Sequence, residues 1–177
     1  MPAGVRRYDP DRRQRIIDAA IRVVGAKGIA GLSHRSVAAE ADVPLGSTTY
    51  HFKTLDDLMV AALRQANEGF TPAPALPEPD LAGALARLLG EFLTADRSRV
   101  ELEYELYLAA LRRPALRPVA AEWCESVVAA LAPRTDPVTA RALVAVMDGI
   151  SLQVLLTDAE YDEAYAREIL SRVLRSA

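Results

Sequence analysis

The chain has 177 residues, of which 51% are hydrophobic and 25% are charged, so it can bury a core and lacks the composition of a disordered protein. The net charge of -3 does not by itself indicate a nucleic-acid partner, but residues 1–70 hold ten Lys and Arg against eight Asp and Glu, whereas residues 71–177 hold eleven against sixteen. One cysteine and two histidines exclude an internal disulfide framework and supply a metal site poorly, so we expect no metal and no cofactor.

The N-terminal stretch MPAGVRRYDPDRR has no apolar segment and contains acids, so it has the pattern of neither a signal peptide nor a transit peptide. We expect no apolar run of membrane-spanning length and no membrane partner. The sequence therefore predicts a soluble, cytoplasmic protein.

Helices are predicted throughout, because apolar residues recur at intervals of three and four rather than two. The first helix is expected to begin with Asp9 as N-cap and Pro10 at the first helical position, and to end at Gly28. Its apolar stripe indicates that one face packs against a core.

Two short helices and a longer one follow. Ser33 can cap the second helix, and Asp42 stands at a sharp turn, where Asp tolerates a left-handed backbone better than most residues. Pro44 can open the third helix. Thr54 and Asp57 have the spacing of a capping box at the start of the fourth helix.

A proline-rich stretch, TPAPALPEPD, interrupts these patterns and is typical of a stiff connector. We place a domain boundary there, with one domain at residues 1–70 and a second at residues 71–177. The second domain is predicted to be a helical bundle, with helices over residues 81–92, 100–111, 114–131, 137–154 and 161–175.

The two short helices and the turn between them, supported by the longer first helix, are typical of a helix-turn-helix, whose second short helix enters the DNA major groove. The third helix suits this use because Gly46 lets the backbone approach DNA, and its neighbours carry hydroxyls that can donate to phosphates or bases. The hydroxyls and the nearby cations belong to Ser47, Thr48, Thr49, Tyr50, Arg35 and Lys53, with Arg6 and Arg7 on an N-terminal arm.

Some of these residues also have a purely structural interpretation. Thr48 can face inward against the first helix, and His51 can cap or pack against the end of the third. Phe52 is expected in the core. Arg6 and Arg7 can belong to a solvated tail.

The stretch RIIDAAIRVVGAKGIAGLSHRSVAAEADVPLGSTTYHFKTLDDL resembles the TetR family of bacterial transcriptional regulators. The matching features are the Ile-x-x-Ala-Ala opening, the Gly28 helix end, the turn at residues 41–43, Gly46, the Tyr-His-Phe triplet at residues 50–52, and Leu58. The resemblance implies an all-α homodimeric repressor that binds double-stranded DNA at a palindromic operator and responds to a small-molecule effector.

By position, the resemblance also implies which residues contact DNA: Ser33, His34, Arg35, Leu45, Gly46, Thr48, Thr49, Tyr50, His51 and Lys53. Three positions depart from the family pattern. Many relatives have Tyr in place of Thr49, Ser in place of Pro44, and Lys in place of Leu55.

The second domain contains large amphipathic rings in an otherwise aliphatic sequence, which favours an apolar ligand pocket with a few polar groups. Glu103 and Cys124 can supply such groups. The predicted pocket residues are Phe92, Glu103, Tyr104, Tyr107, Trp123, Cys124 and Met147. The alternative is that they are packing or surface residues.

The last two helices are predicted to form a four-helix interface with a second subunit. The candidate residues are Val146, Ile150, Val154, Ile169 and Val173, and the alternative is that they lie in the core of one chain. A ligand would then act by tilting the fourth helix, over residues 54–67, and so change the distance between the two recognition helices.

Two other functions compete with this hypothesis. An enzyme is disfavoured, because the sequence offers no nucleophile–base pair, metal cluster or phosphate-binding loop. The alternative of a DNA-binding protein that has no ligand, and acts structurally or through a protein partner, is not excluded by the sequence. Repression, rather than activation, follows only from the resemblance.

Overall fold

The computed structural model describes residues 9–68, 79–157 and 159–175. Arg6, Arg7 and most of the proline-rich connector lie outside the described residues. Within them the chain is all-α, with nine α-helices, three 3-10 turns and no strand, which confirms the predicted fold class.

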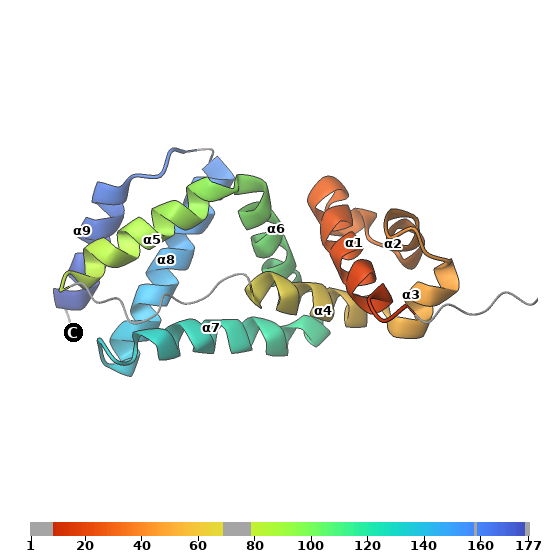
Figure 1. The fold of residues 1–177 in the computed structure, drawn as a ribbon. Coiled ribbons are helices and arrows are strands. Elements are labelled where there is room, and N and C mark those ends of the chain that lie inside the picture. The colour runs from red at the N-terminus through yellow and green to blue at the C-terminus, as the bar shows by residue number, and fades with distance from the viewer. Residues whose placement is uncertain (1–8, 69–78, 158, 176–177) are drawn as a thin grey trace, which may run out of the picture.

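The N-terminal head, at one end of the molecule in Figure 1, contains the three helices of the predicted helix-turn-helix and is followed by a longer helix that leads towards the body. The bounds are α1 (Arg12–Lys27), α2 (His34–Glu40), α3 (Leu45–His51) and α4 (Leu55–Glu68), with a 3-10 turn η1 (Ile29–Gly31) after α1.

The body contains five α-helices, close to the predicted ranges. These are α5 (Leu81–Ala95), α6 (Arg97–Leu108), α7 (Arg117–Leu131), α8 (Pro137–Thr157) and α9 (Glu163–Arg175), with 3-10 turns η2 (Ala109–Leu111) and η3 (Pro114–Leu116) before α7. Helix α5 packs along α9, and α8 packs against both α7 and α9 (Figure 1).

The start of α1 differs from the prediction by two residues. The helix begins at Arg12 and Asp11 is its N-cap, although the Asp11 side chain forms no capping hydrogen bond. Asp9 instead accepts a hydrogen bond from the backbone amide of Asp11 at 3.2 Å. It also forms an ion pair with Arg15 at 2.6 Å. Asp9 therefore stabilises the turn that precedes the helix, which is a common use of Asp.

Two hydrophobic cores are present, and α6 contributes to both. The head core contains residues of α1, α2 and α4 and Phe52 after α3, together with Leu102, Leu106, Leu116 and Val119 from the other side of the connector. Val100, also on α6, belongs to the body core formed with α5, α7, α8 and α9. Figure 1 shows α6 between the head and the rest of the body.

Among the described residues, α8 is long and apolar enough to cross a membrane, which the sequence analysis did not anticipate. Its mean hydropathy reaches 1.5 over 18 residues, and 39% of that window is buried inside the chain. Length and composition are weak evidence for a span, because core helices meet the same criteria. The contacts of α8 with α5, α7 and α9 are those of a core helix.

Candidate DNA-binding head and ligand pocket

The turn between α2 and α3 has the geometry predicted for a helix-turn-helix. Asp42 has a φ of 52°, the left-handed conformation expected at this position. Ser33 and Ser36 form a reciprocal capping box at the start of α2. The Ser33 hydroxyl is thus already bonded within the head, and the local sequence fixes how α2 meets α3.

Thr48 is a correction to the predicted DNA contacts. Its side chain is fully buried, and its hydroxyl donates a hydrogen bond to the backbone carbonyl of Leu45 at 2.8 Å. The His34 carbonyl is 3.5 Å away. Thr48 therefore faces inward, as the structural alternative held, although the backbone carbonyl near its hydroxyl belongs to α2 rather than to the first helix. It has no surface to present to DNA.

The opposite face of α3 is open. Leu45 is 50% exposed and Tyr50 is 82% exposed, while Gly46 and Thr49 lie on the same solvent-accessible side. A Cβ added at Gly46 would meet nothing within 4 Å, so the glycine leaves the helix surface bare there. An exposed aromatic ring beside a bare backbone favours contact with an external partner.

Cationic and aromatic side chains flank this face. Arg35 and Lys53 are exposed, and the Arg13 guanidinium lies 5.0 Å from the centre of the Phe52 ring. Phe52 is buried, as predicted. His51 is half-buried, and its ring meets that of Tyr50 in a T-shaped contact with the ring centroids 5.2 Å apart.

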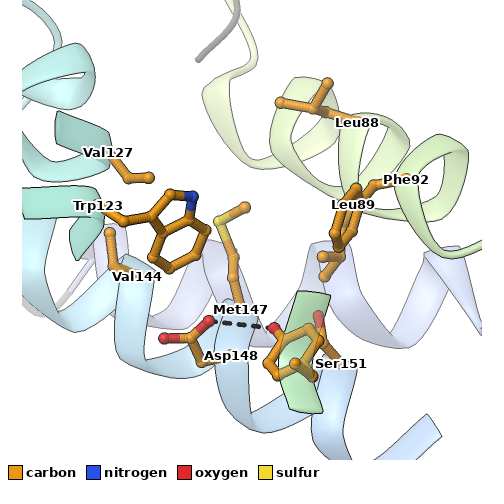
Figure 2. A pocket seen from close by; sticks show the side chains of 10 residues that line it. Leu88, Leu89, Phe92, Trp123, Val127, Val144, Met147, Asp148 and Ser151 are labelled. Carbon is orange, nitrogen blue, oxygen red and sulfur yellow. Dashed lines mark hydrogen bonds between the residues drawn. The ribbon is translucent and has the colours of Figure 1, made fainter. Parts of the chain in front are cut away.

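A cleft in the body brings together six of the seven predicted pocket residues. Two pockets share Phe92, Tyr104 and Trp123 and lie between α5, α6, α7 and α8. Figure 2 shows the one that reaches α8. Their lining comprises Asn67, Leu88, Leu89, Phe92, Glu103, Tyr104, Tyr107, Trp123, Val127, Val144, Met147, Asp148 and Ser151. The seventh predicted residue, Cys124, does not line either pocket, and its sulfur contacts the Tyr107 hydroxyl at 3.1 Å.

The cleft carries two partly buried carboxylates. Tyr104 donates a hydrogen bond to Asp148 at 3.1 Å, the dashed line in Figure 2. Burial raises the pKa of Asp148, although the Tyr104 hydrogen bond opposes the rise. Burial also raises the pKa of Glu103, against the effect of Arg99, which donates to it at 2.8 Å. Desolvated acids in an aromatic pocket favour a cationic ligand.

The hydroxyls of the cleft can act as hydrogen-bond donors. Burial raises the pKa of Tyr104 and of Tyr107 well above the ordinary value for tyrosine, so both keep their protons at neutral pH. The buried Ser151 hydroxyl lies near Tyr104 but reaches hydrogen-bond geometry with none of the described residues.

The void among these side chains is small. Each of the two pockets has a cavity volume of about 30 Å³, room for one or two water molecules. Sites for drug-sized ligands span roughly 300–1,000 Å³. A ligand of that size therefore requires Phe92, Tyr104 or Trp123 to move. Because Tyr104 belongs to α6, its displacement would shift this helix.

Asp148 and Ser151 were not predicted, because α8 was assigned mainly to subunit contact and only Met147 of this helix to the pocket. A signal was available: the two polar residues are three positions apart and interrupt the apolar stretch of residues 142–152, which places them on one face. Val144 and Met147 lie on the same face and also line the cleft.

The residues predicted for a subunit interface are divided by the structure. Ile150 is only 8% exposed and belongs to the body core, so for this residue the core alternative replaces the interface prediction. Val146, Val154 and Val173 are partly buried against the same core. Ile169 is half-buried on α9.

Comparison with known proteins agrees with the two parts of the molecule. Residues 16–62 match the family model for bacterial regulatory proteins of the tetR family, and residues 76–176 match the tetracyclin repressor-like C-terminal domain. The nicotine-responsive transcriptional repressor HdnoR of Paenarthrobacter nicotinovorans is 30% identical over 161 residues, which cover 81% of this chain and 83% of the relative.

Solved structures are similar over almost the whole chain. The multidrug binding protein EbrR in complex with imidazole has a TM-score of 0.89 and 78% identity, covering 93% of this chain and 96% of that one. Its ethidium complex has a TM-score of 0.86 and 79% identity, covering 92% and 98%. A TetR-family member from Streptomyces coelicolor A3 is 78% identical with a TM-score of 0.83, covering 93% and 98%. The chain therefore belongs to the TetR family of DNA-binding transcriptional regulators.

Proposed function

We propose that this protein is a cytoplasmic, homodimeric repressor that binds an inverted-repeat operator and is released when an aromatic cation enters the body cleft. The repressor role is supported by the similarity to HdnoR, which is a repressor. The ligand response is supported by the similarity to EbrR, whose structures include complexes with ethidium, proflavin and malachite green.

The two faces of α6 carry this proposal. One face presents Glu103, Tyr104 and Tyr107 to the cleft. The other places Leu102 and Leu106 in the head core. A ligand that displaces the first face must also disturb the second, because both belong to one rigid helix.

A hydrogen bond strengthens this connection. Glu105 of α6 accepts from the backbone amide of Ile29 at 2.7 Å, directly after α1. The chain turns there at Gly28, which has a φ of 66°, and a Cβ at Gly28 would stand 3.1 Å from the Glu105 carboxylate. Glycine thus allows the body to reach the base of the head.

The chemistry of the cleft supports the ligand class. Aromatic rings can stack on a flat ligand, and Glu103 and Asp148 can balance its charge. Ethidium and proflavin are flat aromatic cations, and malachite green is a triaryl cation, so each combines the two properties that this cleft complements.

The outward face of α8 supports the homodimer. Ala145, Gly149, Leu152 and Leu156 are spaced by four, three and four residues, which places them on one side of the helix. Leu156 is 79% exposed, and a Cβ at Gly149 would meet nothing within 4 Å. Gly149 and Leu152 are half-buried and Ala145 is exposed, so this partly exposed apolar stripe beside α9 can pack on its symmetry mate as a four-helix bundle.

Release requires the ligand to bind one arrangement of the heads more tightly than the other. A coupling of about 1–3 kcal/mol, which is ordinary for allosteric proteins, would weaken operator binding roughly 5- to 150-fold. In the operator-bound dimer the two α3 helices must lie about 34 Å apart, or a multiple of that distance.

The DNA side is tested by selecting duplexes from a random pool with the purified protein. The selected sites should be inverted repeats whose half-sites are about 10 base pairs apart, or a multiple of that. Lys53→Ala should weaken binding to the selected site and lower its salt slope by about one. A protein that enriches no inverted repeat at low salt would disprove the operator proposal.

The ligand side is tested by adding malachite green to the protein–operator complex and measuring fluorescence anisotropy of the labelled duplex. We expect release from the wild type and retention by the Glu103→Gln, Asp148→Asn double variant, which keeps the head intact. This variant controls for binding of the dye to DNA itself. Equal release from both proteins would contradict a role for the cleft.

A further inference from the structure

Helix α6 carries two Arg–Glu pairs of the same spacing and geometry. Arg97 to Glu101 and Arg99 to Glu103 both join residues i and i+4, and in both the Arg Nε is 2.8 Å from the Glu Oε1. Their surroundings differ. The Glu101 side chain is 51% exposed, whereas the Glu103 side chain is 13% exposed and lines the cleft.

The two carboxylates of the cleft are therefore unequal. Asp148 accepts the hydroxyl of Tyr104, and no cation of the described residues forms an ion pair with it. Glu103 already holds a guanidinium. A cationic ligand can therefore pair directly with Asp148, whereas Glu103 is already paired with Arg99.

We infer that Arg99 is an internal competitor for cationic ligands at Glu103, an inference that rests on the ligand class proposed above. The Arg99 side chain is 51% exposed, so it can exchange Glu103 for water at little cost. Each ligand cation must displace it before both carboxylates can be used. The apparent affinity is lowered by the fraction of molecules in which the pair is formed.

A second cavity gives the displaced side chain a place to go. It has a volume of about 120 Å³ and lies where α5 meets α6, lined by Phe92, Ala95, Asp96, Arg99 and Val100. Phe92 separates it from the cleft, because its ring lines both spaces. Arg99 can thus turn from Glu103 towards the Asp96 carboxylate without leaving the neighbourhood of an acid.

This arrangement sets selectivity as well as affinity. A neutral aromatic compound forms no ion pair with Glu103, so displacing Arg99 would not increase its affinity. It binds a cleft in which Arg99 still neutralises Glu103. A cation that reaches both Asp148 and Glu103 recovers the full charge complementarity. Arg99 therefore acts as a specificity-determining residue, although it lies at the rim of the cleft.

The test is a fluorescence titration of the purified full-length protein with ethidium, in the absence of DNA, on wild type, Arg99→Gln, Glu103→Gln and the double variant. We expect Arg99→Gln to tighten binding about 2- to 5-fold, the range for a partly exposed ion pair. Glu103→Gln should weaken binding. In the Glu103→Gln background, Arg99→Gln should have no effect, because the group for which Arg99 competes is then neutral.

Two further variants separate competition from other effects. Arg112→Gln removes the same charge from an exposed position beyond α6 and should leave ethidium binding unchanged. Arg99→Lys keeps the charge but not the guanidinium geometry and should give an intermediate affinity. Measurements at pH 7 and pH 8.5 are both needed, because removing Arg99 lets the pKa of Glu103 rise further, and a protonated Glu103 would hide the gain.

The outcomes are distinct. If the wild type binds ethidium and Arg99→Gln does not tighten binding at either pH, the competition inference is overturned while the proposed function stands. A gain that persists with Gln at position 103, or that Arg112→Gln reproduces, overturns it as well. If the wild type does not bind ethidium, the proposed ligand class fails and this inference fails with it.

Discussion

Asp148 is a carboxylate placed where the fold disfavours its charge. It lies on the side of α8 that faces the cleft, where it accepts a hydrogen bond from the Tyr104 hydroxyl. Burial raises its pKa in the folded chain above the value in the unfolded chain. The folded state therefore holds this proton more tightly, and the free energy of unfolding falls as the pH rises from the unfolded-state pKa through the folded-state pKa.

Asp148→Asn should consequently raise the melting temperature at pH 7.5, by about 2–4 °C. The Asn carbonyl can still accept from Tyr104, so the packing is retained. The difference between variant and wild type should shrink as the pH is lowered through the folded-state pKa and vanish below the ordinary Asp value of 3.8, because Asp148 is then neutral in both states. Melting curves across that range provide the measurement, and a gap that stays constant with pH would contradict the burial argument.

The same substitution should weaken binding of ethidium, since it removes a charge from the cleft. Stability and ligand affinity are thus expected to change in opposite directions at one residue. Such opposition is typical of residues retained for function rather than for folding.

At the scale of the elements, α6 is the structural connection between cleft and head. Its contact with the turn after α1 depends on Glu105, whose carboxylate accepts from the Ile29 amide. Hydrogen bonds to charged groups contribute roughly 1.5–3 kcal/mol. The contact therefore adds to the apolar packing that joins the head and the body.

Glu105→Ala should increase hydrogen exchange of the Ile29 amide by about 10-fold or more. Glu101→Ala is the matched control, because Glu101 lies on the same helix and pairs with Arg97, one turn away, rather than with the head. Mass spectrometry of a peptide that contains residue 29 would report the change. Unaltered protection in Glu105→Ala would show that another group shields this amide.

Most helices could be predicted from local chemistry. Thr54 and Asp57 form the predicted capping box, and backbone and side-chain hydrogen bonds from Thr54 lower the pKa of Asp57. The start of α1 was predicted two residues too early, because an Asp–Pro pair can open a helix or, as here, form the turn before one.

Side-chain direction was harder to predict than helix position. Thr48 and Thr49 are adjacent and chemically identical, yet one is buried and the other exposed. The sequence of α3 alone cannot separate them, because the packing of α2 over α3 decides which threonine turns inward. The aromatic residues of the cleft were predictable because few rings occur in the body, whereas Asp148 was missed because an apolar helix can serve a core, a pocket and an interface with different faces.

For the whole molecule, the exposed stripe of α8 predicts how two chains associate. Leu156→Asp should yield monomers in sedimentation velocity, because a carboxylate would be buried in the interface without a partner. The chain's own fold should tolerate the change, since Leu156 is 79% exposed. The substitution therefore tests association better than one at Ile150, which would damage the body core.

Leu111→Asp provides the control for this experiment. Leu111 is 72% exposed in η2, away from the α8 stripe in the chain. We expect this variant to remain a dimer and to keep operator binding. A Leu156→Asp protein that also stays dimeric would place the subunit contact on another surface.

The head core includes residues from both sides of the connector, which limits how chimaeric regulators can be built. Leu102, Leu106, Leu116 and Val119 complete the interior of the head although they follow the connector. In a chimaera of residues 1–70 with the body of another protein, the head core would pack against side chains that do not match it. A chimaera that also includes residues 97–119 would keep the four residues that complete this core.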